Sequence, residues 1–263
     1  MPPSINSIKA TFWTSKKAVL IGLSSLLLII LIGIGIGGYS FIRSISANHE
    51  ETARFLPADT LVFFSINSRP GLGQLNNLRK IFNIYQKEEG FQKNLDDLEE
   101  KIEEDTKLNP LDDIWDWMGP EVSIAVTSID GLNLDKLESV AFIQTNDEEA
   151  TDKFISKLSK YVEKNEAGRF TKSPPIKQVP GYIWSDEISD QDLHILIYKG
   201  YMLIGTSRTI LANTMTRLEE SRPSLYDDKT FTRFRDSASG RFAFLFVNIG
   251  GFKSIIEEYI PEE

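Results

Sequence analysis

The most apolar stretch of the chain extends from Ala18 to Gly38 and contains no charged side chain. A helix of about 20 residues spans roughly 30 Å, the thickness of the hydrocarbon core of a bilayer. The pattern therefore predicts a single N-terminal transmembrane helix over residues 18–42. It follows a cytoplasmic tail (1–17) and precedes a linker (43–54) and an extracytoplasmic domain (55–263).

The charges that flank this helix give its expected orientation. The tail carries three lysines and no acidic residue, whereas the far side carries Arg43 followed by Glu50 and Glu51. Basic residues favour the cytoplasmic side of a membrane, so we expect the N-terminus inside and the domain outside. The alternative is a cleaved signal peptide, which has a shorter apolar core of about 7–15 residues and a small-x-small cleavage site. Residues 44–47 fit such a site poorly.

Beyond the linker, short runs of β-branched and aromatic residues alternate with segments of helical periodicity. The runs predict strands at 60–67, 121–127, 139–145, 181–184 and 241–248, and a hairpin at 193–205 that turns at Lys199-Gly200. Apolar residues three and four apart predict a long helical region within 75–105. The same spacing predicts helices after Asn146, after Ser207, around Phe231 and around Phe252. The prolines in 173–179 predict a loop.

Hairpins interspersed with helices indicate an α+β fold with a mainly antiparallel sheet and helices packed on one face. Two of the predicted strands look alike, because residues 61–67 (LVFFSIN) and 242–248 (FAFLFVN) both run into Asn and a Gly-containing turn before a helix. Chance similarity between buried strands is one explanation. The other is an internal repeat, in which the final strand either completes the first sheet or begins a longer architecture.

Composition excludes several classes of site. The chain contains no cysteine, which rules out disulfides, thiolate catalysis and Cys-ligated metals. Residues 1–43 hold four of the 29 basic residues and no acid. The rest therefore carries 25 basic and 38 acidic residues, a formal charge of −13. Such an acidic domain is not expected to bind nucleic acid or anionic lipid headgroups.

No catalytic set is visible in the sequence. His49 lies in the linker and His194 in a predicted strand, where it would lie opposite Gly205 and is expected to be structural. Four acids crowd one loop (Asp186, Glu187, Asp190 and Asp192), but their spacing does not match a calcium loop and indicates a solvated turn. The sequence therefore predicts no enzyme, no cofactor and no metal site.

Two features suggest contacts with other proteins. Gly33 and Gly37 form a GxxxG pair that lets a second membrane helix approach closely, although membrane helices are generally rich in glycine. Trp115 and Trp117 lie among aspartates. One of these tryptophans is expected to enter the core and the other to form an exposed partner surface. The alternative is that both are buried.

Several segments together resemble a membrane-anchored bacterial family of unknown function, which is best represented in cyanobacteria and also found in actinobacteria. The matching segments are the apolar span, residues 55–60 (FLPADT), residues 113–122 (DIWDWMGPEV) and residues 147–150 (DEEA). In a cyanobacterial source the resemblance implies a thylakoid location, with the domain in the lumen or the periplasm. No activity or catalytic residue is known for the family, so the resemblance implies no site.

These observations lead to one functional hypothesis and one alternative. We expect a non-enzymatic, single-pass membrane protein that serves as an accessory, assembly or stabilising subunit of a membrane complex. It would act through protein-protein contacts, including an oligomer mediated by its membrane helix. The alternative is a binding module for an apolar ligand such as a lipid or pigment, because rings such as Phe63, Phe64, Phe242, Phe244 and Phe246 could line a cleft. Ordinary core packing also explains those rings.

Overall fold

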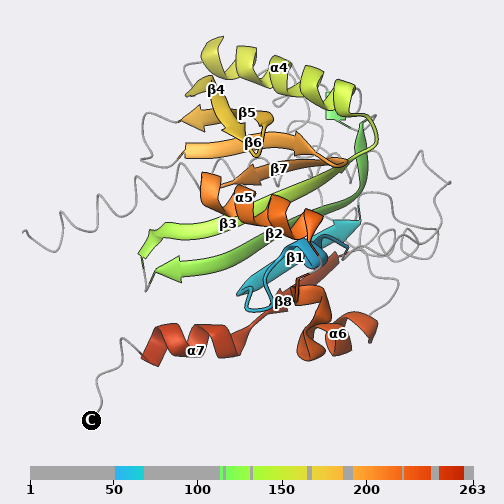
Figure 1. Ribbon diagram of the computed structural model, residues 1–263, viewed down its shortest axis with the longest axis vertical. Coiled ribbons are helices and arrows are strands. Elements are labelled where there is room, and N and C mark those ends of the chain that lie inside the picture. Colours follow the sequence, from blue (N-terminus) through green and yellow to red (C-terminus); the bar gives the residue numbers. More distant parts are fainter. Residues whose placement is uncertain are drawn as a thin grey trace, which may run out of the picture.

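The computed structural model describes residues 51–67, 113–114, 117–130, 133–164, 168–185, 192–220, 222–237 and 243–257. They form an eight-stranded sheet with the strand order β4-β5-β6-β7-β3-β2-β1-β8, flanked by a few helices (Figure 1). Each neighbouring pair of strands is antiparallel. The predicted α+β fold with a mainly antiparallel sheet is therefore confirmed.

The elements follow one another along the chain as η1 (Glu51–Phe55), β1 (Val62–Asn67), β2 (Met118–Asp130), β3 (Asn133–Thr145), α4 (Glu148–Lys164), β4 (Arg169–Ile176), β5 (Val179–Ser185), β6 (Asp192–Tyr198), β7 (Tyr201–Gly205), α5 (Arg208–Glu219), η3 (Leu225–Asp227), α6 (Lys229–Asp236), β8 (Ala243–Val247) and α7 (Ile249–Glu257). The final strand β8 lies beside β1, so it completes the sheet that β1 belongs to.

The predicted transmembrane helix and the predicted helical region within 75–105 lie outside the described residues. Among the helices that the structure does describe, none combines the length and the apolarity needed to cross a bilayer.

Helices cover both faces of the sheet, so the prediction of helices on one face is wrong. On one face, Ile143 and Ile204 belong to a core cluster with Phe154 of α4, which we call the α4-side core. On the other face, Phe142 and Leu203 belong to a cluster that includes residues of α5, α6, η1 and η3, the α5-side core. The inner strands are apolar at consecutive positions, and such strands are buried on both faces.

The helices are distributed unevenly along the sheet (Figure 1). α4 contacts β4 and β6 at one end, whereas α5 contacts β3, β4, β6 and β7. α6 and α7 lie near β8 at the opposite end of the sheet. The α4-side face is therefore covered by a described helix at the β4 end only.

The folded domain already includes residues that the sequence assigns to the linker. Glu51–Phe55 form the short helix η1, in which Thr52 and Ala53 are buried. Residues 51–54 therefore pack with the described sheet and its helices.

Two hairpin turns contain residues in the left-handed region. The predicted turn Lys199-Gly200 joins β6 to β7, with φ values of 48° and 77°. Such values match a type I′ turn, whose twist suits a hairpin. The predicted loop at 173–179 is wrong, because these residues form the end of β4, a second such turn and the start of β5. That turn is Lys177-Gln178, with φ values of 48° and 69°.

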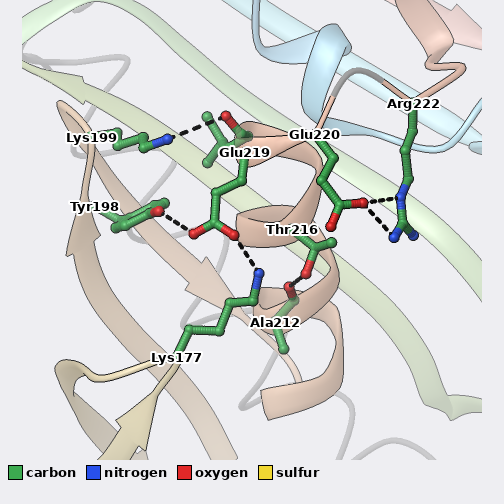
Figure 2. A network of polar contacts seen from close by, with 9 residues as sticks. Lys177, Tyr198, Lys199, Ala212, Thr216, Glu219, Glu220 and Arg222 are labelled. Carbon is green, nitrogen blue, oxygen red and sulfur yellow. Dashed lines mark hydrogen bonds and ion pairs between the residues drawn. The ribbon is translucent and has the colours of Figure 1, made fainter.

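A polar network ties both turns to the last turn of α5 (Figure 2). The Glu219 carboxylate accepts hydrogen bonds from Lys177 Nζ and Tyr198 OH, each at 2.6 Å. Lys199 Nζ donates to the Leu218 carbonyl at 3.4 Å. These contacts lower the pKa of Glu219, first through Lys177 and then through Tyr198. Because exposed ion pairs add little stability, the network mainly fixes the two turns against the helix.

The start of α4 differs slightly from the prediction. Asp147, rather than Asn146, caps the helix, because its carboxylate accepts a hydrogen bond from the Ala150 amide at 2.9 Å. The backbone amide of Asn146 instead donates to the Trp117 carbonyl at 2.7 Å. The predicted cap at Ser207 of α5 is confirmed, since its hydroxyl accepts from the Ile210 amide at 3.1 Å.

Candidate interaction surface

The end strand β8 exposes one row of apolar side chains. Its residues alternate between exposed and buried, with Phe244 and Phe246 in the α5-side core. Leu245 and Val247 point the opposite way and are 61% and 44% exposed. Ile249, two residues further on, is 77% exposed. We call Leu245, Val247 and Ile249 the β8 ridge.

Packing on the opposite side holds β8 in place. The ring of Phe231 in α6 lies edge-on to Phe244 and Phe246, with centroid distances of 5.5 Å and 5.2 Å. Phe231 also contacts Phe63 of β1 at 5.6 Å in the same manner. Edge-to-face ring pairs add to the gain from burial. The buried half of β8 is thus fixed by aromatic contacts, which sets the direction of its exposed half.

The chain passes from β8 into α7 at Asn248, between the last two residues of the ridge. The Asn248 amide donates to the Leu61 carbonyl at 2.8 Å, and its side-chain oxygen accepts from the Gly251 amide at 3.0 Å. Asn248 thus caps α7 in the manner usual for a helix start. A Cβ at Gly251 would lie 2.6 Å from Leu61 Cδ2, so only glycine fits without displacement. Ile249 is thereby held in the first turn of α7.

The β8 ridge is the outer part of a wider apolar surface. Across the sheet, Leu245 lies opposite Phe64 of β1, which lies opposite Ile124 of β2. The next row contains Val247, Val62 and Val126 in the same order. Side chains on adjacent strands contact one another directly. These residues of β1 and β2 are half-buried, whereas Leu245 and Val247 are exposed. Exposed apolar surface marks sites of interaction with other molecules, so the β8 ridge is the candidate functional site.

A buried polar cluster lies on the opposite face and secures η1. The Glu121 carboxylate of β2 accepts hydrogen bonds from the amide and the hydroxyl of Thr52, at 3.2 Å and 2.6 Å. The same hydroxyl lies 2.6 Å from the hydroxyl of Ser123. All three residues are buried. The first described residues of the chain are therefore fixed to the centre of the sheet.

Tyr201 of β7 lies close to this cluster. Burial, and then the charges of Glu121 and Glu51, raise the pKa of its phenol from 10.0 to about 12. Its ring also contacts Phe55 of η1 at 5.6 Å. Ionisation of Tyr201 would therefore place a negative charge beside two carboxylates.

We expect Tyr201 to make the fold sensitive to alkaline pH. Its pKa is higher in the folded chain than in the unfolded chain, so the unfolded state loses the proton first. Stability should then fall as the pH rises from 10.0 to about 12. Denaturant unfolding across this range, compared with Tyr201→Phe, is the measurement. An equally steep fall in the variant would assign the effect to other groups.

Comparison with protein-family models gives one match. The model described as "Protein of unknown function (DUF3352)" matches residues 24–259. The chain belongs to this DUF3352 family. The match includes the β8 ridge, the Glu121 cluster and most of the predicted apolar span. The chain matches no curated protein and no solved structure.

The sites predicted from sequence have different outcomes in this DUF3352 protein. Trp117 is 2% exposed, contacts Phe154 at 5.2 Å and donates to the Asp113 carbonyl at 2.6 Å. Its large apolar ring fills the α4-side core, so Trp117 does not form the predicted partner surface. Trp115, Gly33 and Gly37 lie outside the described residues.

The predicted register of His194 is confirmed. His194 lies opposite Gly205, in the register that the Lys199-Gly200 turn predicts. It is buried, and desolvation lowers its pKa. Asp192, nearby in the chain, accepts a hydrogen bond from the Ser185 hydroxyl at 2.6 Å. No cluster of potential metal ligands occurs among the described residues. His49, Asp186, Glu187 and Asp190 lie outside them.

Sequence reasoning missed the β8 ridge. Residues 242–247 are apolar throughout, so the pattern does not show which side chains are exposed. The exposure follows from the position of β8 at the end of the sheet. That position depends on the pairing of β8 with β1, and the periodicity of the sequence does not show it.

Proposed function

We propose that this chain is a non-enzymatic, single-pass membrane protein that acts as an accessory, assembly or stabilising subunit through protein-protein contacts in a membrane complex. The observation that carries the proposal is the exposed apolar β8 ridge on an otherwise acidic domain. Burying such a ridge against a partner is favourable because it removes apolar surface from water.

The sequence supports the membrane part of the proposal. The uncharged run from Ala18 to Gly38 has the length of a bilayer span, and the family match begins within it, at residue 24. The lysines before the run and the acidic residues after it favour an extracytoplasmic domain. In a cyanobacterial host, this would be the periplasm or the thylakoid lumen.

The rings that suggested an apolar ligand are occupied with one another. Phe63, Phe244 and Phe246 all contact Phe231 and are buried. Phe64 is partly buried against the α4-side core, and Phe242 lies outside the described residues. The described rings therefore support core packing rather than a cleft for an apolar ligand.

Recovery of membrane-protein partners tests the proposal. We expect full-length tagged protein to stay in the membrane after alkaline carbonate washing and to co-purify with membrane proteins in mild detergent. The paired substitution Leu245→Lys and Val247→Lys should reduce that recovery several-fold, because an interface would then have to bury two ammonium groups. Replacing Gly33 and Gly37 with isoleucine should reduce it through the membrane helix.

The control is Ser156→Lys, at an exposed position on α4. It adds one lysine at the opposite end of the sheet and should leave recovery unchanged, whereas each single ridge substitution should lower it. Release of the protein by carbonate would contradict the membrane anchor. Purification as a lone monomer, or recovery unaffected by the ridge substitutions, would contradict the proposed use of the ridge.

A further inference from the structure

The two strands with similar sequences, β1 and β8, have different surroundings in the sheet. β1 pairs with β2 on one side and with β8 on the other. Among the described strands, β8 has one neighbour, β1. The outer edge of β8 therefore lacks a counterpart of β2 in the part of the chain that the structure describes.

The composition of β8 suits pairing with a further strand. Residues 243–247 (AFLFV) contain no charge and no proline. Proteins usually protect an end strand with charged residues, proline or a bulge, because an open edge readily pairs with another chain. The other end strand, β4, follows that rule, since it carries Pro174 and Pro175 and a register shift before Ile176.

We propose that the outer edge of β8 pairs antiparallel with β8 of a second copy of this chain, about a twofold axis at Leu245. The two β8 ridges then lie side by side and form one apolar row that continues from one copy to the other, while the outward face of that row stays open to a further partner. In this register Ala243 lies opposite Val247, Phe244 opposite Phe246, and Leu245 opposite its own equivalent. Each pair is apolar and joins side chains on the same face of the sheet.

Self-pairing satisfies the symmetry of a homodimer. A twofold interface places the same patch on both subunits, so the patch must be complementary to itself. β8 meets this condition because its ends carry a small and a branched residue that exchange positions across the axis. No like charges face each other, because Ala243–Val247 carry none.

The size of the interface predicts a weak dimer in dilute solution. A five-residue ladder and three exposed side chains bury on the order of a few hundred Å² per copy, below the roughly 800 Å² per partner of a stable interface. Anchoring both copies in one membrane raises their effective concentration. The inference rests on the proposed function because it requires both copies to be anchored in one membrane.

Cross-linking in the membrane tests the pairing. The chain contains no cysteine, so a single Leu245→Cys substitution introduces a unique thiol. In the proposed register the two Cα atoms at position 245 lie about 4.5–5.5 Å apart, within the range that a disulfide requires. Copper-phenanthroline oxidation of the full chain in its membrane should convert most of the protein to a disulfide-linked dimer.

Two comparisons make the test specific. Ser156→Cys, exposed on α4, should remain largely monomeric under the same conditions. Adding Val247→Lys to Leu245→Cys should reduce the dimer at least fivefold, because the lysine would face the apolar end of the second strand. Val247 is partly exposed, so this variant should keep the fold, which circular dichroism would verify.

Several results would overturn the proposal. A Leu245→Cys chain that stays monomeric and reacts with maleimide as fast as Ser156→Cys would show an unpaired edge. A monomer protected from maleimide would place another part of the same chain on the edge, and cross-linking to a different protein would identify a different occupant. Fractionation separates these results from the proposed function: a soluble protein that still forms the dimer at high concentration would refute only the anchor.

Discussion

Replacing Phe231 with alanine is expected to lower the free energy of unfolding by about 3–5 kcal/mol, the usual loss for a buried phenylalanine. The Phe231 side chain is fully buried and contacts the rings of Phe63, Phe244 and Phe246. The substitution removes the aromatic contacts that join α6 to both β1 and β8. Denaturant unfolding of the full chain in mild detergent, followed by tryptophan fluorescence, measures the change.

Phe234 provides the matched control for this prediction. It lies one turn further along α6 but is 48% exposed. Phe234→Ala should therefore cost less than about 0.5–1 kcal/mol, as is usual for exposed positions. If both alanine variants lost the same small amount, Phe231 would not hold α6 against the sheet.

The loss at Phe231 should also reach the β8 ridge. β8 is secured by β1 on one side and by α6 on its buried face. Removal of the ring leaves a cavity beneath the strand, which weakens the support of its exposed residues. We therefore expect faster hydrogen exchange in residues 243–247 of Phe231→Ala than in β6 or β7.

Local patterns predicted the strands and hairpins well. The β6–β7 hairpin and its Lys199-Gly200 turn follow from two apolar runs and from turn residues that adopt positive φ. The similarity between residues 61–67 and 242–248 left open whether the last strand completes the first sheet, and its pairing with β1 answers this.

Features that depend on distant contacts could not be predicted in the same way. Pro174 and Pro175 predict a loop where the last residues of β4 lie. An end strand tolerates proline because one of its sides makes no ladder. The inner strands are apolar at consecutive positions, so helices cover both faces of the sheet. This pattern does not show which helix packs on which face.

The residues of the candidate interaction surface could not be predicted from the sequence for the same reason. Trp117 and the β8 ridge are both strongly apolar in sequence, yet the first is buried by Phe154 and the second lies exposed at the end of the sheet. Glu121 reads as a surface acid, but its partner Thr52 is 69 residues away in the sequence. Exposure at these positions is decided by tertiary contacts rather than by residue type.

The contact between Glu121 and Thr52 should be the main polar determinant of stability near the start of the domain. Hydrogen bonds to a charged acceptor contribute about 1.5–3 kcal/mol each, and a buried donor left without an acceptor adds a penalty. The two donors of Thr52 both bind this carboxylate and are fully buried. Their loss would also free η1, which connects the sheet to the preceding part of the chain.

We therefore expect Glu121→Ala to lower the free energy of unfolding by about 2–4 kcal/mol and to accelerate hydrogen exchange in residues 51–56. Glu121→Gln keeps the side-chain size and one acceptor oxygen, so it should cost roughly 1 kcal/mol and leave η1 protected. A double-mutant cycle with Thr52→Val isolates the hydroxyl bond and should give a coupling of about 1–3 kcal/mol. If the effects of the Glu121 and Thr52 substitutions were additive, apolar residues alone would hold η1 against the sheet. The Glu121 carboxylate would then stabilise the sheet without fixing η1.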